Sequence, residues 1–109
     1  MKYYFHQTVE NPEFGIGIST IDGILVYGTN SALMGNSPRL CEAEKFYVIK
    51  YSLPLRLTAG DFLLRAGVSI QKSGQPCLLH LRRGFVHMEV TDTPHCTGLT
   101  DLECEFEIL

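Results

Sequence analysis

The residues best suited to metal or redox chemistry in this sequence are its four histidines and four cysteines. They are His6, His80, His87 and His95, with Cys41, Cys77, Cys96 and Cys104. Cys77 and His80 are spaced like a pair of zinc ligands, and His87 follows them. A structural zinc site needs a second ligand pair at similar spacing, which the sequence lacks. We therefore expect no metal site.

Carboxylates are numerous, but their pattern does not indicate catalysis. Glu103, Glu105 and Glu107 alternate with apolar residues, which is typical of the solvated face of a strand. A Ser–His–Asp triad assembles in space and cannot be nominated from spacing. We expect a protein that binds rather than converts, with no catalytic residues and no cofactor.

Nucleotide and nucleic-acid binding are also not expected. The segment GIGIST (residues 15–20) has neither the lysine of a phosphate-binding loop nor a following helix. The isoelectric point is about 5.7, whereas nucleic-acid-binding domains are usually basic, and no RNA-binding sheet motif is present.

The net charge of −3 conceals three segments of different charge. Residues 1–44 sum to −3, residues 45–83 to +6 and residues 84–109 to −6. One interpretation is that acidic and basic strands are neighbours and pair across a sheet. The other is a basic face for an anionic ligand. Both stay open from the sequence, and the first is favoured.

Length and composition indicate one domain covering residues 1–109. No apolar run approaches the ~20 residues of a membrane span. The opening Met1-Lys2-Tyr3-Tyr4 does not begin a signal peptide. The cysteines form no C-x-x-C pair, so we expect them to be reduced, in a cytoplasmic protein.

Apolar and polar residues alternate with a period of two along much of the chain, which predicts strands. The longest alternation covers residues 47–57, where Pro54 indicates an edge or a bend because it has no amide donor. Residues 62–70 alternate similarly. Residues 102–108 are the most regular, and we expect Leu102, Cys104, Phe106 and Ile108 to face the core. Shorter candidates are residues 3–9, 14–19, 24–27, 77–81 and 85–90.

Glycine-containing turns separate these candidates. Asp22-Gly23 predicts a hairpin turn, because glycine tolerates positive φ. Ser73-Gly74-Gln75-Pro76 ends one strand and Thr58-Ala59-Gly60-Asp61 precedes another, while a short helix is expected at residues 38–44. About eight short strands without long helical segments predict an all-β fold, an antiparallel β-sandwich.

The polar stretch Tyr27-Gly28-Thr29-Asn30-Ser31 follows an apolar strand. Asn and Ser next to Gly are common turn formers whose side chains cap their own backbone. The alternative is contact with a sugar, because sugar sites combine amides, charged groups and apolar plates. Spacing alone does not separate the two interpretations.

The stretch ENPEFGIGISTIDGILVYGTNS (residues 10–31) resembles the C-terminal domain of Wzt-type ATP-binding proteins, which serve ABC transporters that export O-antigen and related polysaccharides. The matching elements are Asn11-Pro12-Glu13-Phe14-Gly15, Asp22-Gly23 and Tyr27-Gly28-Thr29-Asn30. The segments LPLRLTAGDFLLRAGVSI and GLTDLECEFEIL are similar to later strands of that family, though less specifically.

The resemblance implies a jelly-roll or immunoglobulin-like sandwich that binds the non-reducing end of a glycan on the cytoplasmic side of the inner membrane. It also implies a homodimer, whose copies can exchange a terminal strand. The partners would be the transporter's nucleotide-binding and membrane subunits, and any ATPase activity would lie in a separate nucleotide-binding domain. The family usually has one or two further strands before the Asn-Pro motif. Either the domain is truncated, or a second copy supplies the missing edge.

We expect the carbohydrate to lie across the outward side chains of the central basic strands. The predicted carbohydrate-binding residues are Lys50, Arg65, His80, Arg82 and His87, together with Asn30. Arg and His would donate to hydroxyls or to an acidic terminal group, because Arg presents a fixed fork of donors. The alternative function is a protein–protein module that dimerises without recognising glycan directly.

Overall fold

The chain forms antiparallel β-sheets in a computed structural model that describes residues 1–91 and 96–109. Within these residues there is no helix and there are eight strands. They are β1 (Lys2–Phe5), β2 (Val9–Glu10), β3 (Glu13–Thr20), β4 (Leu25–Asn30), β5 (Leu40–Cys41), β6 (Lys45–Val48), β7 (Gly60–Lys72) and β8 (Gln75–Val90). The predicted all-β sandwich is confirmed. His95 lies outside the described residues.

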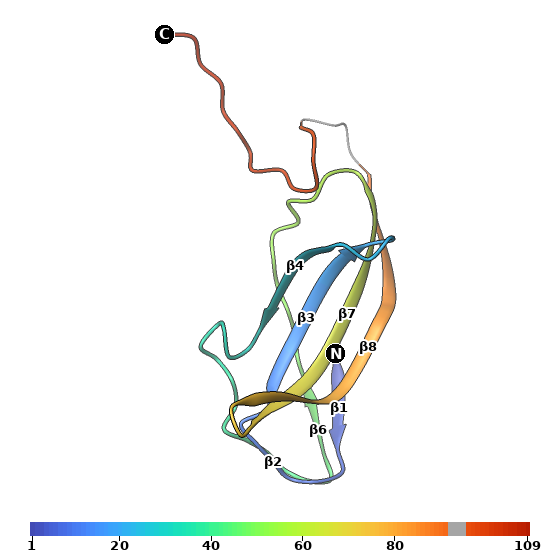
Figure 1. Cartoon of the computed structure of the whole chain (residues 1–109), viewed down its shortest axis with the longest axis vertical. Helices are drawn as coiled ribbons and strands as arrows, with labels where there is room; N and C mark the ends of the chain where they lie inside the picture. Colours follow the sequence, from blue (N-terminus) through green and yellow to red (C-terminus); the bar gives the residue numbers. More distant parts are fainter. Residues whose placement is uncertain (92–95) are drawn as a thin grey trace.

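The main sheet has four antiparallel strands in the order β4-β3-β7-β8 (Figure 1). Two of its connections are the predicted glycine turns. Gly23, with φ of 93°, closes the turn between β3 and β4, and Ser73 and Gly74, with φ of 54° and 76°, join β7 to β8. Two consecutive residues at positive φ are typical of the hairpin turn that matches the twist of a sheet.

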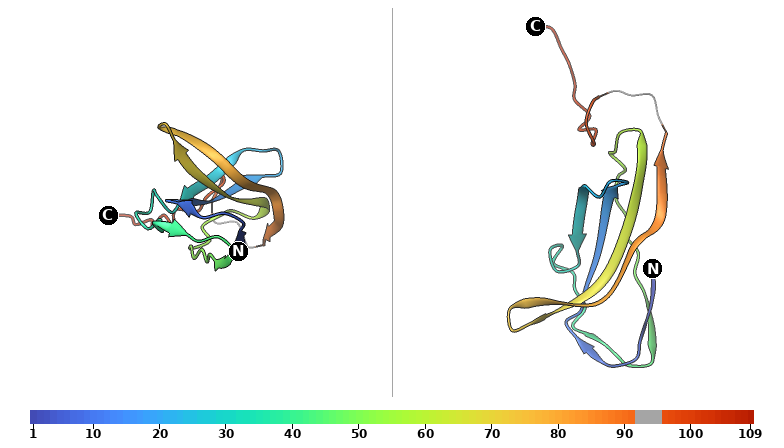
Figure 2. Two further views of the ribbon diagram at one scale, coloured as in Figure 1. Left: turned by 90° about the horizontal axis from the view of Figure 1, so that it is seen from below. Right: turned by 45° about the vertical axis from the view of Figure 1, so that its right-hand side comes forward.

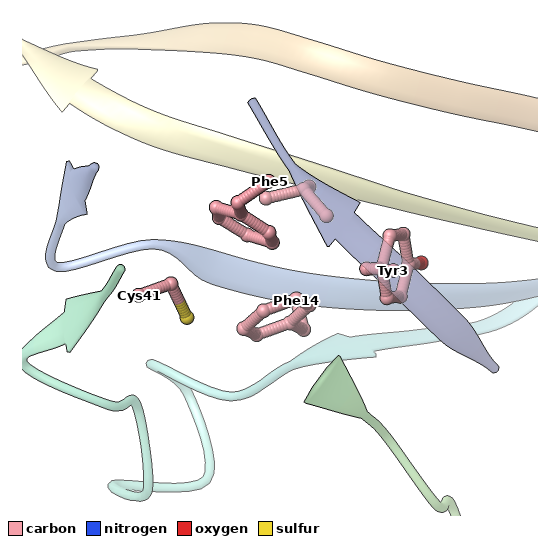
Figure 3. Close-up of a cluster of buried hydrophobic side chains, with 5 residues drawn as sticks. Tyr3, Phe5, Phe14 and Cys41 are labelled. Carbon is pink, nitrogen blue, oxygen red and sulfur yellow. The ribbon is translucent and has the colours of Figure 1, made fainter. Parts of the chain in front are cut away.

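A second, smaller layer covers one end of the main sheet. It consists of the pairs β1–β6 and β2–β5 (Figure 2). The layers meet in a core of Tyr3, Phe5, Phe14, Cys41 and Val68 (Figure 3). The Phe14 ring lies 5.3 Å from that of Tyr3 and 6.2 Å from that of Phe5, centroid to centroid. Phe14 of β3 therefore joins the main sheet to β1.

Several predicted elements differ from the observed ones. Residues 77–81 and 85–90 belong to one strand, β8, which pairs with β7 through two register shifts. The helix expected at residues 38–44 is absent, because Leu40–Cys41 pairs with β2 instead. Tyr27–Asn30, expected to form a turn, makes up the last four residues of β4, and the turn begins at Ser31.

Two other predicted strands are also wrong, the first of them in part. Of residues 47–57, only Tyr47 and Val48 are in a strand, and beyond them Leu57 makes a single bridge to Thr100. Pro54 cannot donate to a ladder, and the nearby Leu53 and Leu55 are exposed. Residues 102–108 form no strand with any described residue, and Leu102, Phe106 and Ile108 are 81–86% exposed instead of facing the core. Cys104 is exposed as well.

Among residues 1–91 and 96–109, no helix is long and apolar enough to cross a membrane.

Candidate functional site

The main sheet carries a cavity on the face that points away from β1 and β6. We call it the outer-face cavity; its volume is about 410 Å³ and it extends over all four strands. The side chains around it include Leu25, Asn30, Leu33, Arg65, Leu78 and Leu81. It is therefore a hollow with mostly apolar walls and a few polar groups.

The hollow exists because glycines replace side chains on this face. Gly15 pairs with Gly67, and Gly17 pairs with Gly28 across the β3–β4 ladder. All four glycines line the cavity. Residues 14 and 18 of β3 are buried in the core, so residues 15 and 17 face the other side of the sheet. The floor of the outer-face cavity is thus backbone.

At two of these glycines, a side chain would come too close to a neighbouring atom. A Cβ atom on Gly17 would lie 2.7 Å from Nε of Arg65, and one on Gly67 would lie 2.7 Å from the backbone oxygen of His80. A side chain at residue 67 would push β8 away, and one at residue 17 would displace Arg65. The Arg65 side chain therefore lies across Gly17, its partner in the β3–β7 register.

Asn30 lies at the end of β4, where it borders the outer-face cavity. Its Oδ1 accepts a hydrogen bond from the Leu33 N–H at 2.8 Å, so its side chain caps the following turn. The next residue, Ser31, is buried, and its Oγ accepts a hydrogen bond from the Phe14 N–H at 2.9 Å. The capping interpretation holds for Asn30, whereas Ser31 bonds to β3 and the preceding residues lie in β4; Asn30 borders the cavity as well.

His80 and Arg82 lie on the opposite face of the sheet from Arg65. They pair with Val68 and Ala66, whose side chains are buried between the layers. Both line a second cavity, of about 770 Å³, beside β1. The His80 ring stands edge-on to Tyr3, with centroids 6.5 Å apart. The expectation of one outward basic face is therefore wrong for these two residues.

Lys50 and His87 border neither cavity. Lys50 is exposed in the irregular segment after β6. His87 is exposed on β8, and its Nε2 lies 2.9 Å from Oδ1 of Asp61. Of the six predicted residues, the structure brings Asn30 and Arg65 together at the outer-face cavity and His80 and Arg82 together at the second cavity.

The four floor glycines were not predicted as site residues. A signal for two of them is present in the sequence, because Gly15 and Gly17 are two residues apart and must face the same side of a strand. Their alignment with Gly28 and Gly67 depends on strand register. Register between distant strands is not readable from one sequence.

Chemistry at a metal centre finds no support in the part of the chain that the structure describes. No group of three or more His, Cys, Asp or Glu residues there could hold a metal ion. The four cysteines are free thiols, and burial raises the pKa of the Cys41 thiol. A raised pKa disfavours the reactive thiolate. Cys41 is fully buried, and we assign it to the core and not to a reactive site.

The fold and the outer-face cavity define the class of protein: an antiparallel β-sandwich whose larger sheet presents a hollowed face. The sequence model of the Wzt C-terminal domain matches residues 1–102. The chain belongs to this family, which supplies the C-terminal domains of polysaccharide ABC exporters. The resemblance inferred from residues 10–31 is thereby confirmed.

A solved structure is similar over the whole chain. The crystal structure of the C-terminal domain of Wzt has 32% sequence identity and a TM-score of 0.90, covering 100% of this chain and 67% of that one. No curated protein matches the chain in sequence.

Proposed function

We propose that this chain is a carbohydrate-binding domain of a polysaccharide exporter, and that its outer-face cavity holds the non-reducing end of the exported glycan, such as O-antigen. The observation that carries the proposal is the outer-face cavity on this family's fold. A concave surface with apolar walls and a few fixed polar groups is the usual form of a small-ligand site.

The lining of the cavity suits a sugar ring. Leu25, Leu33 and Leu81 offer apolar contact to the C–H groups of the ring, while Asn30 and Arg65 offer hydrogen bonds to hydroxyls. The backbone floor lets the ring approach the sheet closely. In this proposal the domain holds the glycan and converts nothing.

The same proposal gives the domain its partners and its place in the cell. The glycan end would be held next to the exporter's nucleotide-binding and membrane subunits, at the cytoplasmic face of the inner membrane. The ATPase activity would lie in the nucleotide-binding domain. A single open sugar site binds weakly, since millimolar affinity corresponds to only about −4 kcal/mol, and pairing two domains on one polymer would strengthen it.

Titration of the ¹⁵N-labelled chain with the glycan of its own organism tests this function. We expect chemical-shift changes at residues of the outer-face cavity and weaker binding by Arg65→Ala. Arg82→Ala is the matched control, because it removes the same side chain from the opposite face. Absence of shift changes at high millimolar glycan would contradict the proposal, as would equal losses in the two variants.

A second candidate function, dimerisation, is favoured by the exposed apolar segment 102–109. Its alternating sequence is that of a strand, yet Leu102, Phe106, Ile108 and Leu109 are 81–106% exposed. The end of the chain extends away from the sheets (Figure 1). We propose that this segment pairs with a second copy of the chain, in a homodimer that exchanges the strand. An exposed strand-like segment with unpaired backbone groups invites such pairing.

A further inference from the structure

The charge in the outer-face cavity is unbalanced. Arg65 is partly buried there, and of the described residues that line the cavity none is acidic. Among the described residues Arg65 takes part in no ion pair; the pairs present are Lys45–Glu42, Arg56–Glu103 and His87–Asp61. The molecule therefore keeps a guanidinium group without a counter-charge at its hollowed face.

This arrangement lowers the stability of the folded chain, and no other feature of the described residues explains it. Removing a charged group from water is unfavourable unless it is paired. Glycine within a strand is less stabilising than alanine. The strand register places Gly17 opposite Arg65, and a Cβ atom at residue 17 would lie 2.7 Å from Nε of Arg65, so the Arg65 side chain would have to shift. The Gly17–Arg65 pair thus holds a positive charge at a defined place.

We infer that the outer-face cavity recognises a negatively charged sugar unit, in which a carboxylate or a phosphate ester pairs with Arg65. The inference rests on the proposed function and adds the chemical class of its ligand. A guanidinium group presents a planar fork of donors that matches both oxyanions. Near the cavity floor, where the anion displaces water, the interaction is stronger than at an exposed lysine.

The probes are methyl β-D-glucuronide, glucose 6-phosphate and the neutral methyl β-D-glucoside, each titrated into the ¹⁵N-labelled chain at low salt. Inorganic phosphate alone serves as a fourth probe. We expect at least one sugar anion to bind about tenfold more tightly than the neutral glucoside, because a hydrogen bond to a charged group is stronger than a neutral one. Its affinity should fall as ionic strength rises. The glucuronide and the phosphate arms distinguish the two sources of negative charge.

Variants assign the effect to Arg65. Arg65→Gln should remove the preference for the anion, so that the sugar anions and the neutral glucoside bind with similar affinity. Arg82→Gln is the charge-matched control on the opposite face. Gly17→Ala should also weaken anion binding, because its methyl group would meet Nε of Arg65 at 2.7 Å, whereas Gly15→Ala meets only ordinary contacts, from 3.6 Å. Circular dichroism verifies that each variant is folded. Gly17→Ala and Arg65→Gln test independently whether anion binding depends on Arg65.

The outcomes separate this inference from the proposed function. If the native glycan binds but the anionic and neutral probes bind equally well, or Arg65→Gln keeps the anion preference, the inference is wrong and the proposed function stands. If a sugar anion binds through Arg65 but the native glycan does not bind, the inference stands and the proposed function is wrong. If inorganic phosphate binds as tightly as the sugar anions, the inference is wrong, because the cavity would then recognise the charge without the sugar. If none of the probes changes any chemical shift, the inference is also wrong.

Discussion

Two buried tyrosine hydroxyl groups, those of Tyr3 and Tyr51, have no hydrogen-bond partner among the described residues. Burial, with a smaller contribution from the neighbouring Tyr3, raises the pKa of Tyr51 to about 12, and burial also raises the pKa of Tyr3. An unpaired buried hydroxyl destabilises a fold, and its ionised form does so more. These residues therefore make stability depend on pH in alkaline solution.

The direction of this dependence follows from proton binding. In the unfolded chain Tyr51 releases its proton near pH 10, whereas in the folded chain it holds the proton until about pH 12. Between these values unfolding releases a proton, so rising pH favours the unfolded state. Below pH 10 Tyr51 is protonated in both the folded and the unfolded state, so its ionisation does not lower the stability of the fold.

We predict that Tyr51→Phe is at least as stable as the wild type at pH 7 and loses less stability between pH 10 and 12. Urea unfolding at pH 7, 10 and 11 measures both effects. Tyr27→Phe, at a ring that is 47% exposed, is the control and should follow the wild-type profile. A Tyr51→Phe variant that is clearly less stable at pH 7 would show that its hydroxyl is bonded.

At the scale of elements, the loop that follows β4 is fastened to β3 by Ser31. The Ser31 N–H donates to the Phe14 carbonyl at 2.8 Å, and the Ser31 Oγ accepts from the Phe14 N–H at 2.9 Å. The Oγ atom also lies 2.7 Å from Oγ of Ser37. One short side chain thus extends the β3–β4 ladder past the end of β4, beside the outer-face cavity.

We predict that Ser31→Ala lowers the free energy of unfolding by about 1–3 kcal/mol, because it leaves the buried Phe14 N–H without a partner. Urea denaturation measures the change. Ser37→Ala is the matched control: it removes one hydroxyl from the same pair but keeps the bond to Phe14, so its effect should be smaller. Equal losses in the two variants would mean that the bond to Phe14 contributes nothing.

The sequence predicts the existence of strands better than their partners. Alternation correctly identified residues 14–19 and 62–70, which lie within β3 and β7. The alternation at residues 102–108 is as regular, yet these residues have no pairing strand among those described. Alternation with a period of two shows only that the two faces of a segment differ in polarity. A strand also requires a neighbouring strand for its backbone hydrogen bonds.

Strand register also decides which predicted site residues meet. In a uniform strand, Leu78, His80, Arg82 and Val86 would all face one side. The register shifts opposite Leu64–Ala66 and Val68–Ser69, so Leu78 borders the outer-face cavity while His80 and Arg82 face β1. The shift at Val68–Ser69 adds one residue, Leu79, to β8 and reverses the alternation, whereas the shift at Leu64–Ala66 adds two residues and preserves it. A basic residue in the sequence gives no sign of either shift. Arg65, in the regular β7, could be predicted on the outer face, and its alignment with Gly17 could not.

For the whole molecule, size and exposure indicate that one copy leaves apolar surface uncovered. The radius of gyration is 17.1 Å, whereas a compact domain of about this length has a value of ~13 Å. The segment after Thr100 extends away from the sandwich (Figure 2). Its apolar side chains, including Phe106 at 86% and Ile108 at 84% exposure, would gain most from a partner.

We predict that the chain sediments at twice its 12.2 kDa mass, and that Phe106→Asp combined with Ile108→Asp makes it a monomer, because charged side chains cannot occupy the buried side of an exchanged strand. Glu105→Gln combined with Glu107→Gln alters the polar side of the same alternation and should keep the dimer. A chain shortened to residues 1–101 should also be monomeric, with retained β-structure by circular dichroism.

Analytical ultracentrifugation over a hundredfold range of concentration measures the oligomeric state of each chain. A wild-type chain that is monomeric throughout, or a shortened chain that still dimerises, would exclude exchange of this segment. Because residues 102–109 do not line the outer-face cavity, the monomeric variant should still bind a single sugar unit but lose the added strength on a long polymer.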